Sequence, residues 1–279
     1  DTLRYDRSSG IGKARKNVSI YDTTESVTLR GDFADYNEKS GSMLISQRAE
    51  IQRPFGKDTL YLHADTLRSL LDTMIDKRTI YAYHKAQFYK ADFQGRCDSL
   101  TYAESDSMMR LYKDPIIWND DNQLVADTVL IQLANDKLHT LYLIKSGFIS
   151  SEVDSIHFDQ IKGKTITGYF TDNELSRVLV EGNGETVYFA EDEKNSYIGV
   201  NKAVCSRMMI HLDSSAIQSI VFYTAPEATL FPIKDLPGDE MRLKGFQWFG
   251  EVRPQNRASI FEWKALAPRE TSNRKRIKQ

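Results

Sequence analysis

The chain has 279 residues, of which 41% are hydrophobic and 27% are charged, so it can bury a core and is neither disordered nor fibrous. Its 37 basic and 39 acidic residues give a formal net charge of −2, which removes the global electrostatic case for a protein that binds nucleic acid. No apolar run approaches the roughly 18 residues that a membrane-spanning helix needs. The length alone leaves one or two domains open.

A short pattern recurs along the chain and sets its organisation. It consists of a small residue, then Asp or a polar substitute, then an apolar residue two positions further on. We call the second position of each pattern a mark. The spacings between marks are 31, 33, 33, 29, 37 and 37 residues, a period of about 33 that indicates a repeat architecture. The seven marks are Asp1, Asp32, Asp65, Asp98, Asp127, Lys164 and Asn201.

The residues around each mark predict β-strands, two in each period. Apolar residues alternate on either side of the mark, but their phase flips there, as between Ala64 and Leu67 around Asp65. A phase flip in a strand means one extra residue, so we predict a bulge or corner at each mark that keeps one face inward. The predicted fold is therefore all-β, an elongated stack of antiparallel strands in two facing sheets over residues 1–225.

Residues 66–78 are the one stretch of this region with helical spacing. A cap is available at Asp65, and the segment predicts either an ordered loop or a helix in one connection. The residues that carry the spacing are Leu67, Leu70, Leu71, Met74 and Ile75.

The repeat pattern stops after residue 225. Residues 226–264 contain several prolines and the aromatic run at 246–249, and we predict that they form a cap over one open end of the stack. Residues 265–279 predict a basic, mobile tail. Its basic side chains are Arg269, Arg274, Lys275, Arg276 and Lys278.

No motif in the sequence singles out catalysis, a metal or a cofactor. The five histidines lie in separate repeats without zinc-ligand spacing, and no phosphate-binding loop or nucleophile elbow is present. A pair of catalytic carboxylates stays open, because the acidic residues are numerous. Cys97 and Cys205 lie several repeats apart, so we expect two buried free thiols rather than a disulfide. We expect Lys90, Arg96 and Arg110 on a solvated strand face.

The inward face is the remaining candidate site. Its apolar residues either form a dry core between two sheets or line an open groove for a lipid, and alternation alone does not separate these readings. The inward set comprises Leu29, Leu62, Phe88, Leu100, Ile116, Val129, Ile131, Phe148, Ile166, Val187 and Ile198.

Three runs in the middle of the chain carry a family resemblance. They are CDSLTY at 97–102, LYKDPIIW at 111–118 and QLVAD at 123–127, with LKGFQW at 243–248 near the end. Together they resemble the OstA-like family (LptA-like, organic solvent tolerance), especially its Bacteroidetes forms. The resemblance implies a taco-shaped β-jelly roll in the Gram-negative periplasm that shields the acyl chains of lipopolysaccharide on their way to the outer membrane. It also implies other envelope transport subunits and end-to-end copies as partners.

Physical chemistry makes such a role reasonable without an enzyme. Exposing one acyl chain of about a dozen carbons to water costs on the order of 10 kcal/mol, at about 0.8 kcal/mol per methylene, and an apolar groove removes that cost. The competing reading is a closed β-sandwich that serves as a scaffold in an envelope complex. In an open groove, Leu100→Asp or Ile131→Asp is expected to stop lipid binding without unfolding the chain.

The first residues of the chain predict an unpaired edge strand. Because Asp1 aligns with later corner residues, we expect the chain to be a fragment of a longer protein. We also expect the strand at residues 1–5 to accept another strand, either from preceding residues or from a second copy.

Overall fold

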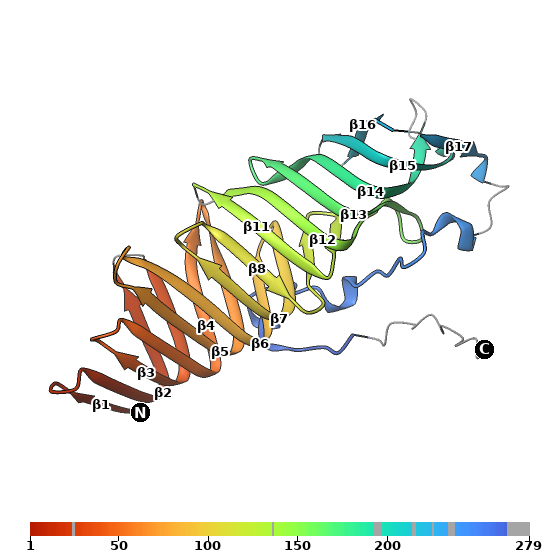
Figure 1. The fold of residues 1–279 in the computed structure, drawn as a ribbon. Helices are drawn as coiled ribbons and strands as arrows, with labels where there is room; N and C mark the ends of the chain where they lie inside the picture. The colour runs from red at the N-terminus through yellow and green to blue at the C-terminus, as the bar shows by residue number, and fades with distance from the viewer. Residues whose placement is uncertain are drawn as a thin grey trace, which may run out of the picture.

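The structure is a computed structural model that describes residues 1–23, 26–135, 137–191, 197–213, 216–224, 226–233 and 238–266. Within these residues, seventeen strands join in one continuous hydrogen-bonded sheet, stacked in an elongated array (Figure 1). Every strand pairing is antiparallel, which confirms the predicted all-β class of antiparallel strands. The strands are β1 (Thr2–Asp6), β2 (Ile11–Asp22), β3 (Val27–Asn37), β4 (Ser42–Phe55), β5 (Asp58–Asp72), β6 (Lys77–Lys90), β7 (Phe93–Ala103), β8 (Met108–Tyr112), β9 (Ile116–Asn119), β10 (Asn122–Val125), β11 (Thr128–Ala134), β12 (Lys137–Glu152), β13 (Phe158–Thr171), β14 (Glu174–Glu191), β15 (Tyr197–Asp213), β16 (Ala216–Phe222) and β17 (Glu227–Phe231).

The strands bend at most of the predicted corners. Between β4 and β5, Ser46 pairs with Thr66 and Ala49 with Ala64, so two residues of β4 face the single mark Asp65. Those two, Gln47 and Arg48, both have positive φ. An extra residue of this kind is a β-bulge, and it bends the strand. Equivalent register shifts lie opposite Asp32 and Lys164.

Side chains and backbone hold these corners in place. The Asp32 carboxylate accepts a hydrogen bond from the Asn17 N–H at 3.1 Å, which satisfies a backbone group that the bulge removes from the ladder. The Asp98 N–H donates to the Lys113 carbonyl at 3.2 Å, and the Asp127 N–H donates to the Lys145 carbonyl at 3.1 Å. Asp32, Asp98 and Asp127 are therefore corner formers.

Two local predictions are wrong. The last corner lies at Ser206, because the register shift falls between the pairs Glu181–Arg207 and Gly184–Cys205, whereas Asn201 sits inside a regular stretch of β15. Residues 66–78 contain no helix. They end β5, form a turn and begin β6, because long-range pairing with β4 and β6 overrides the local helical spacing.

The bends fold the one sheet into two facing layers. One layer contains residues such as 49–55, 86–90 and 158–163, and the other contains residues such as 42–46, 66–72 and 77–83. A single hydrophobic cluster draws side chains from both layers, for example Leu62 and Leu67 on either side of the Asp65 corner. The core therefore lies between the layers.

The C-terminal segment covers the outside of the first layer. We call residues 238–266 the strap; it contains the 3₁₀ helices η2 (Gly238–Met241), η3 (Gly250–Val252) and η4 (Ala258–Phe261). Figure 1 shows it leaving the C-terminal strands, running back along the stack and then reversing. The layer beneath it is called the covered layer, and the other is called the bare layer. The predicted end cap is therefore wrong in its position, since the strap lies along the stack.

Candidate functional site

An open cavity lies between the layers at the β1–β3 end of the stack. Its volume is about 760 Å³, within the range of about 300 to 1,000 Å³ that is typical of ligand sites. Leu3 and Tyr21 on its lining are 78% and 60% exposed, so the cavity opens to solvent. We call this space the vestibule. Its apolar lining includes Leu3, Ala14, Val18, Ile20, Ala34 and Met43.

A second, smaller cavity of about 60 Å³ lies deeper between the layers. It shares Asp22, Met43 and Arg78 with the vestibule, so these three residues stand at the junction of the two spaces. Residues of both layers line the inner cavity, which places it within the fold of the sheet. Its apolar lining comprises Val27, Leu29, Met43, Ile45, Ile51, Leu67 and Ile80.

Charged side chains edge this inner cavity on the side away from the bends. The Arg78 guanidinium donates to the Gly41 carbonyl at 3.1 Å and to Ser69 Oγ at 3.3 Å. The Arg53 guanidinium, from the covered layer, lies 5.6 Å from the centre of the Tyr102 ring in the bare layer. The Arg53–Tyr102 contact joins the two layers at their free margins, and together with Arg78 it gives the apolar space a polar border.

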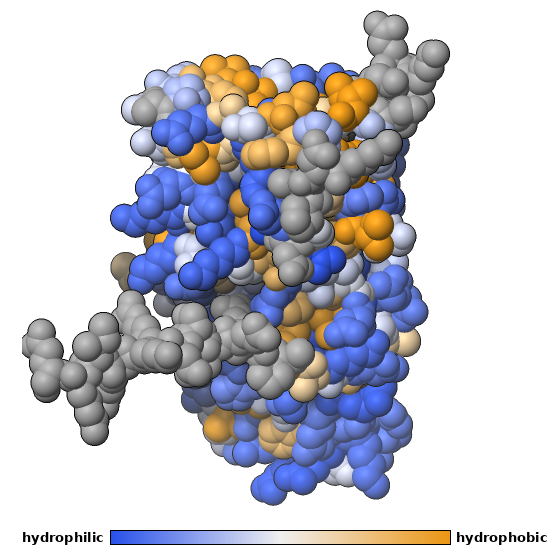
Figure 2. Space-filling view, turned by 90° about the vertical axis from the view of Figure 1, so that its right-hand side faces the viewer, coloured by the Kyte–Doolittle hydropathy of each residue, from blue (hydrophilic) through white to orange (hydrophobic). Residues whose placement is uncertain are grey.

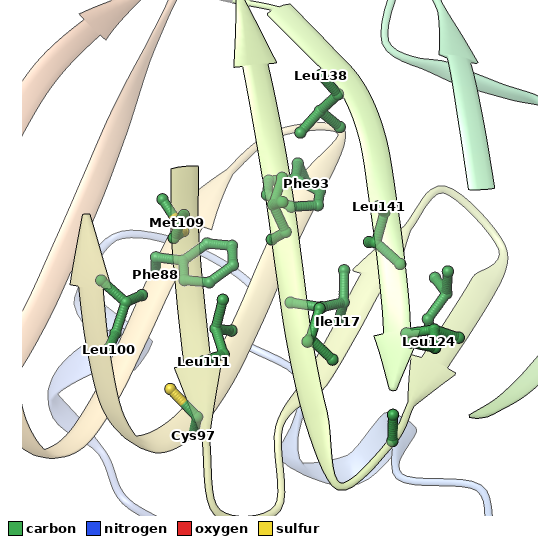
Figure 3. Close-up of a cluster of buried hydrophobic side chains, with 14 of the residues drawn as sticks. Phe88, Phe93, Cys97, Leu100, Met109, Leu111, Ile117, Leu124, Leu138 and Leu141 are labelled. Atoms are coloured by element: carbon green, nitrogen blue, oxygen red, sulfur yellow. The ribbon is translucent and has the colours of Figure 1, made fainter. Parts of the chain in front are cut away.

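The middle of the interior is solid. Leu100, Leu111, Ile131 and Leu141 of the bare layer have no exposed surface, and they belong to one cluster with Phe88 and Ile117 of the covered layer, which are at most 1% exposed. Figure 3 shows Leu100, Leu111, Phe88 and Ile117 filling the space between these strands. No route for a lipid is visible there, so the dry-core reading holds for this part.

Seven members of the predicted inward set do lie between the layers. Leu29 is half-buried against the core and lines the inner cavity, while the other six are buried in the main cluster. Those six are Leu62, Phe88, Leu100, Val129, Ile131 and Ile166.

Four members of the set do not face the interior. Ile116, Phe148 and Val187 lie on the outer face of the covered layer, in two smaller clusters with strap residues. Ile198 is 55% exposed. The prediction of Ile116, Phe148 and Val187 was wrong because strands buried on both faces carry apolar residues at consecutive positions, so alternation no longer identifies the inner face.

The outer face of the covered layer presents a row of side chains that runs across the strands. Register places Gln94, Trp118, Gln123, Ser150 and Gln160 side by side on successive strands. All five are at most 2% exposed, because the strap runs over them. Sequence reasoning missed this row, although buried amides at matching places in successive hairpins are a signal that could have found it.

The strap binds this row through its backbone. The Gln160 amide donates to the Met241 carbonyl at 2.9 Å, and its oxygen accepts the Leu243 N–H at 2.8 Å. Gln123 repeats the arrangement: its amide donates to the Gln247 carbonyl at 2.8 Å and its oxygen accepts the Phe249 N–H at 2.6 Å. Each side chain thus satisfies two backbone groups that are two residues apart.

The strap then turns and returns along a second row. Its turn is held by Arg257, whose guanidinium donates to both oxygens of the buried Glu50 carboxylate at 2.7 and 2.8 Å. On the return, the Gln87 amide donates to the Ile260 carbonyl at 2.8 Å. Arg96 stacks 3.9 Å from the centre of the Trp263 ring and donates to the Lys264 carbonyl at 2.8 Å.

This cover corrects the prediction of a solvated basic face. Arg96 is 1% exposed beneath the strap, and Lys90 is 6% exposed with its ammonium group over the Phe55 ring of the main cluster. Burial lowers the pKa of Arg96 to about 10. Lys90 forms an ion pair with Asp92. Of the three residues, Arg110 remains nearest to solvent, where it pairs with Asp106 in a hairpin turn.

The two cysteines occupy equivalent corners. Cys97 Sγ donates to the Ser99 carbonyl at 3.2 Å, and Cys205 Sγ donates to the Arg207 carbonyl at 3.3 Å. Both side chains are buried, and burial raises the pKa of each thiol. A group of three or more potential metal ligands is absent from the described ranges. No helix within those ranges has the length and apolar character needed to cross a membrane.

Comparison with family models finds no match, and comparison with curated proteins finds none either. Among solved structures, the chain is similar to LptH, the LptA homologous periplasmic component of the conserved lipopolysaccharide transport device from Pseudomonas aeruginosa. That similarity has a TM-score of 0.39 and 12% sequence identity, and it covers 51% of this chain and 100% of the LptH chain. The lining of the interior, rather than this likeness, bears on what the chain binds.

Proposed function

We propose that the chain is a lipid-binding protein that takes acyl chains into the vestibule and shields them from water. The observation that carries this proposal is the vestibule itself, an open space of about 760 Å³ that leads past Met43 into a smaller apolar cavity. Each methylene that leaves water there is stabilised by about 0.8 kcal/mol. No reaction is needed for this role, and the proposal includes none.

The ligand we propose is lipopolysaccharide or a related lipid, carried in the periplasm toward the outer membrane. Support comes from the sequence runs that resemble the OstA-like family and from the polar border beside the apolar space. Arg53, Arg68 and Arg78 line the inner cavity together with Asp22 and Glu104, so an amphiphile finds apolar walls and charged groups within one site. Other envelope transport subunits, and end-to-end copies through edge strands, are proposed partners.

A scaffold function is the alternative, and the solid middle favours it. Leu100 and Ile131 have no exposed surface, as in an ordinary sandwich core. In this reading the vestibule would be only an unfilled end of the stack.

Met43 offers the sharpest test, because it stands at the junction of the two cavities. Met43→Asp places a charge in the path of an acyl chain, and we expect at least a tenfold loss of affinity for a fluorescent fatty acid. Mass spectrometry of lipids extracted from the purified protein should likewise show less bound lipid than in the wild type. Competition with purified lipopolysaccharide then identifies the preferred class of ligand.

The matched control is Met74→Asp. Met74 lies in the turn between β5 and β6 and is 90% exposed, so the same substitution there should leave lipid binding unchanged. A wild-type protein that neither copurifies with lipid nor takes up the fatty acid would contradict the proposed function. The scaffold function would then be the one that fits.

A further inference from the structure

A further open cavity lies on the outer face of the covered layer, beside the turn of the strap. Its volume is about 710 Å³, similar to that of the vestibule. Ser19, Arg30 and Glu50 lie side by side on β2, β3 and β4 by register, and all three line the cavity. Arg257 and Phe261 of the strap belong to the same lining. The strap turn and three strands thus share one polar space, which we call the groove.

Both carboxylates of the groove are engaged by groups of the chain itself. Glu50 accepts hydrogen bonds from the Arg257 guanidinium on both of its oxygens, and the Gln52 amide donates to one of them at 2.8 Å. Asp32 accepts the Asn17 N–H at the bulge of β2. Because Arg257 neutralises Glu50, only Asp32 leaves a negative charge that acts against an incoming anion.

Two guanidinium groups of the groove have no such counter-charge. Arg30 and Arg48 are exposed, and neither forms an ion pair with a carboxylate of the described residues. The Arg48 guanidinium lies 4.9 Å from the centre of the Phe261 ring, a contact that holds it at the groove without using an acceptor. Guanidinium groups stay charged and bond phosphate or carboxylate oxygens through paired N–H groups. The groove therefore offers an excess of positive charge to an anion.

The groove and the vestibule meet at the bulge of β2. Asn17, Val18 and Ser19 line both cavities. Val18 is buried in the main cluster, whereas Asn17 and Ser19 are exposed on either side of it. Since β1 pairs only with residues 11–15 of β2, the stretch 18–22 has a strand partner on one side only within the described part of the chain. At this edge, one strand separates the apolar space between the layers from the charged space outside.

We infer that the groove is a headgroup site for a phosphate monoester, and that its ligand passes over the edge of β2 with an acyl chain in the vestibule. This inference rests on the proposed function, because the vestibule holds the chain. A phosphate monoester fits better than a carboxylate, since its three terminal oxygens can accept from Arg30 and Arg48 at once. The ligand class is therefore a lipid whose phosphate lies close to its acyl chain.

Two lipids that differ only by the phosphate test the site in the full chain. They are 1-lauroyl lysophosphatidic acid and 1-lauroylglycerol, each used below its critical micelle concentration to displace a fluorescent fatty acid. The phosphorylated lipid should bind at least tenfold more tightly. Arg30→Gln combined with Arg48→Gln should remove this preference and leave the affinity for 1-lauroylglycerol unchanged, because only charge-assisted hydrogen bonds to the phosphate are lost.

The matched control removes the same charge elsewhere at this end of the stack. Arg4 and Arg7 are exposed and line neither the groove nor the vestibule, so Arg4→Gln with Arg7→Gln should keep the preference. Equal loss in both double variants, or equal affinity of the wild type for the two lipids, would overturn the headgroup site while the vestibule stands. A wild type that takes up neither lipid would overturn the proposed function and this inference with it.

Glycerol 3-phosphate tests whether the phosphate must belong to a lipid. Titration calorimetry should show that it binds the wild type at least a hundredfold more weakly than 1-lauroyl lysophosphatidic acid, because it places no chain in the vestibule. Equal affinity of the two would overturn a ligand that spans both cavities, since the groove would then bind free phosphate esters.

Discussion

The two regions of the interior share one pattern and differ in what they enclose. Around β2 and β3, at the end of the stack, small residues such as Ala14 and Ala34 stand beside larger ones such as Ile20, and the layers enclose the vestibule. Around β7 to β12 the inward residues include Leu100 and Leu141, and the layers meet in a solid core. Alternation places side chains on the inner face, but it does not determine whether the layers there enclose a cavity or meet in a core.

The largest expected effect comes from placing the same charge in both regions. Ile131→Asp buries an unpaired carboxylate among fully buried residues and should cost about 4 kcal/mol of folding free energy or more. Met43→Asp, beside open space, should cost about 1 kcal/mol. Urea denaturation followed by circular dichroism measures both.

This expectation reverses the one drawn from the sequence, in which Ile131→Asp and Leu100→Asp spared the fold. Ile131→Val, which loses a single methylene, should cost about 1 kcal/mol and calibrates the scale. A stable Ile131→Asp protein would show that the middle of the interior opens in solution. That result would contradict the contrast between the solid middle and the vestibule.

Glycine substitutions compare the two regions at the scale of one methyl group. A Cβ added at Gly95 would meet the Phe88 ring at 2.4 Å and Ile117 at 2.8 Å, so Gly95→Ala should cost about 1 to 3 kcal/mol. A Cβ at Gly12, in the vestibule, would meet only the exposed Tyr5 ring, at 3.3 Å. Gly12→Ala should therefore change stability by less than about 0.5 kcal/mol.

The thermal midpoints of the two alanine variants check this prediction. Equal losses at both positions would indicate that the vestibule closes around its lining in solution. A larger loss at Gly12 would contradict the contrast directly.

The sequence predicted local features well, but it predicted poorly that the strap buries the outer face of the covered layer. The corner at Asp65 was predicted because the alternation of apolar residues changes phase between residues that are close in sequence. The position of the strap was predicted wrongly because its partners, such as Gln123 and Phe249, lie 126 positions apart and share no period. Residues 66–78 were misassigned for the same reason, since pairing with β4 and β6 decides their structure. The sequence also gives the side-chain volumes of the inward residues, but a prediction from alternation alone does not use them.

Exposed apolar residues also lie at the other end of the stack. Figure 2 shows hydrophobic residues gathered at the top of the face it draws, where Figure 1 places the C-terminal strands. Val221 in β16 and Leu230 in β17 are 43% and 52% exposed. The vestibule end likewise carries the exposed Leu3 and Tyr21, so both ends of the stack offer apolar side chains outward, and end-to-end contact between copies stays a prediction.

The smallest expected effect concerns pH and separates the covered layer from the bare one. His63 Nδ1 lies 2.7 Å from the Ala49 carbonyl oxygen, and its ring centre lies 4.6 Å from that of Phe261 in the strap. Burial lowers the pKa of His63 below its usual value of 6.5, and the nearby Arg48 acts in the same direction. The unfolded chain therefore takes up the proton first, so stability present above pH 6.5 is lost progressively as the pH falls through the lower folded pKa.

We expect this loss to appear first at the strap turn, which rests on the neutral imidazole. Amide hydrogen exchange at residues 257–262 should become faster between pH 7 and pH 5, by more than the change in intrinsic exchange rate, while residues 128–134 of the bare layer keep their protection. His63→Gln keeps a polar side chain but does not titrate, so it should remove the dependence on pH. If both segments lost protection together, the strap and the layers would form one cooperative unit, and the strap turn would have no separate opening.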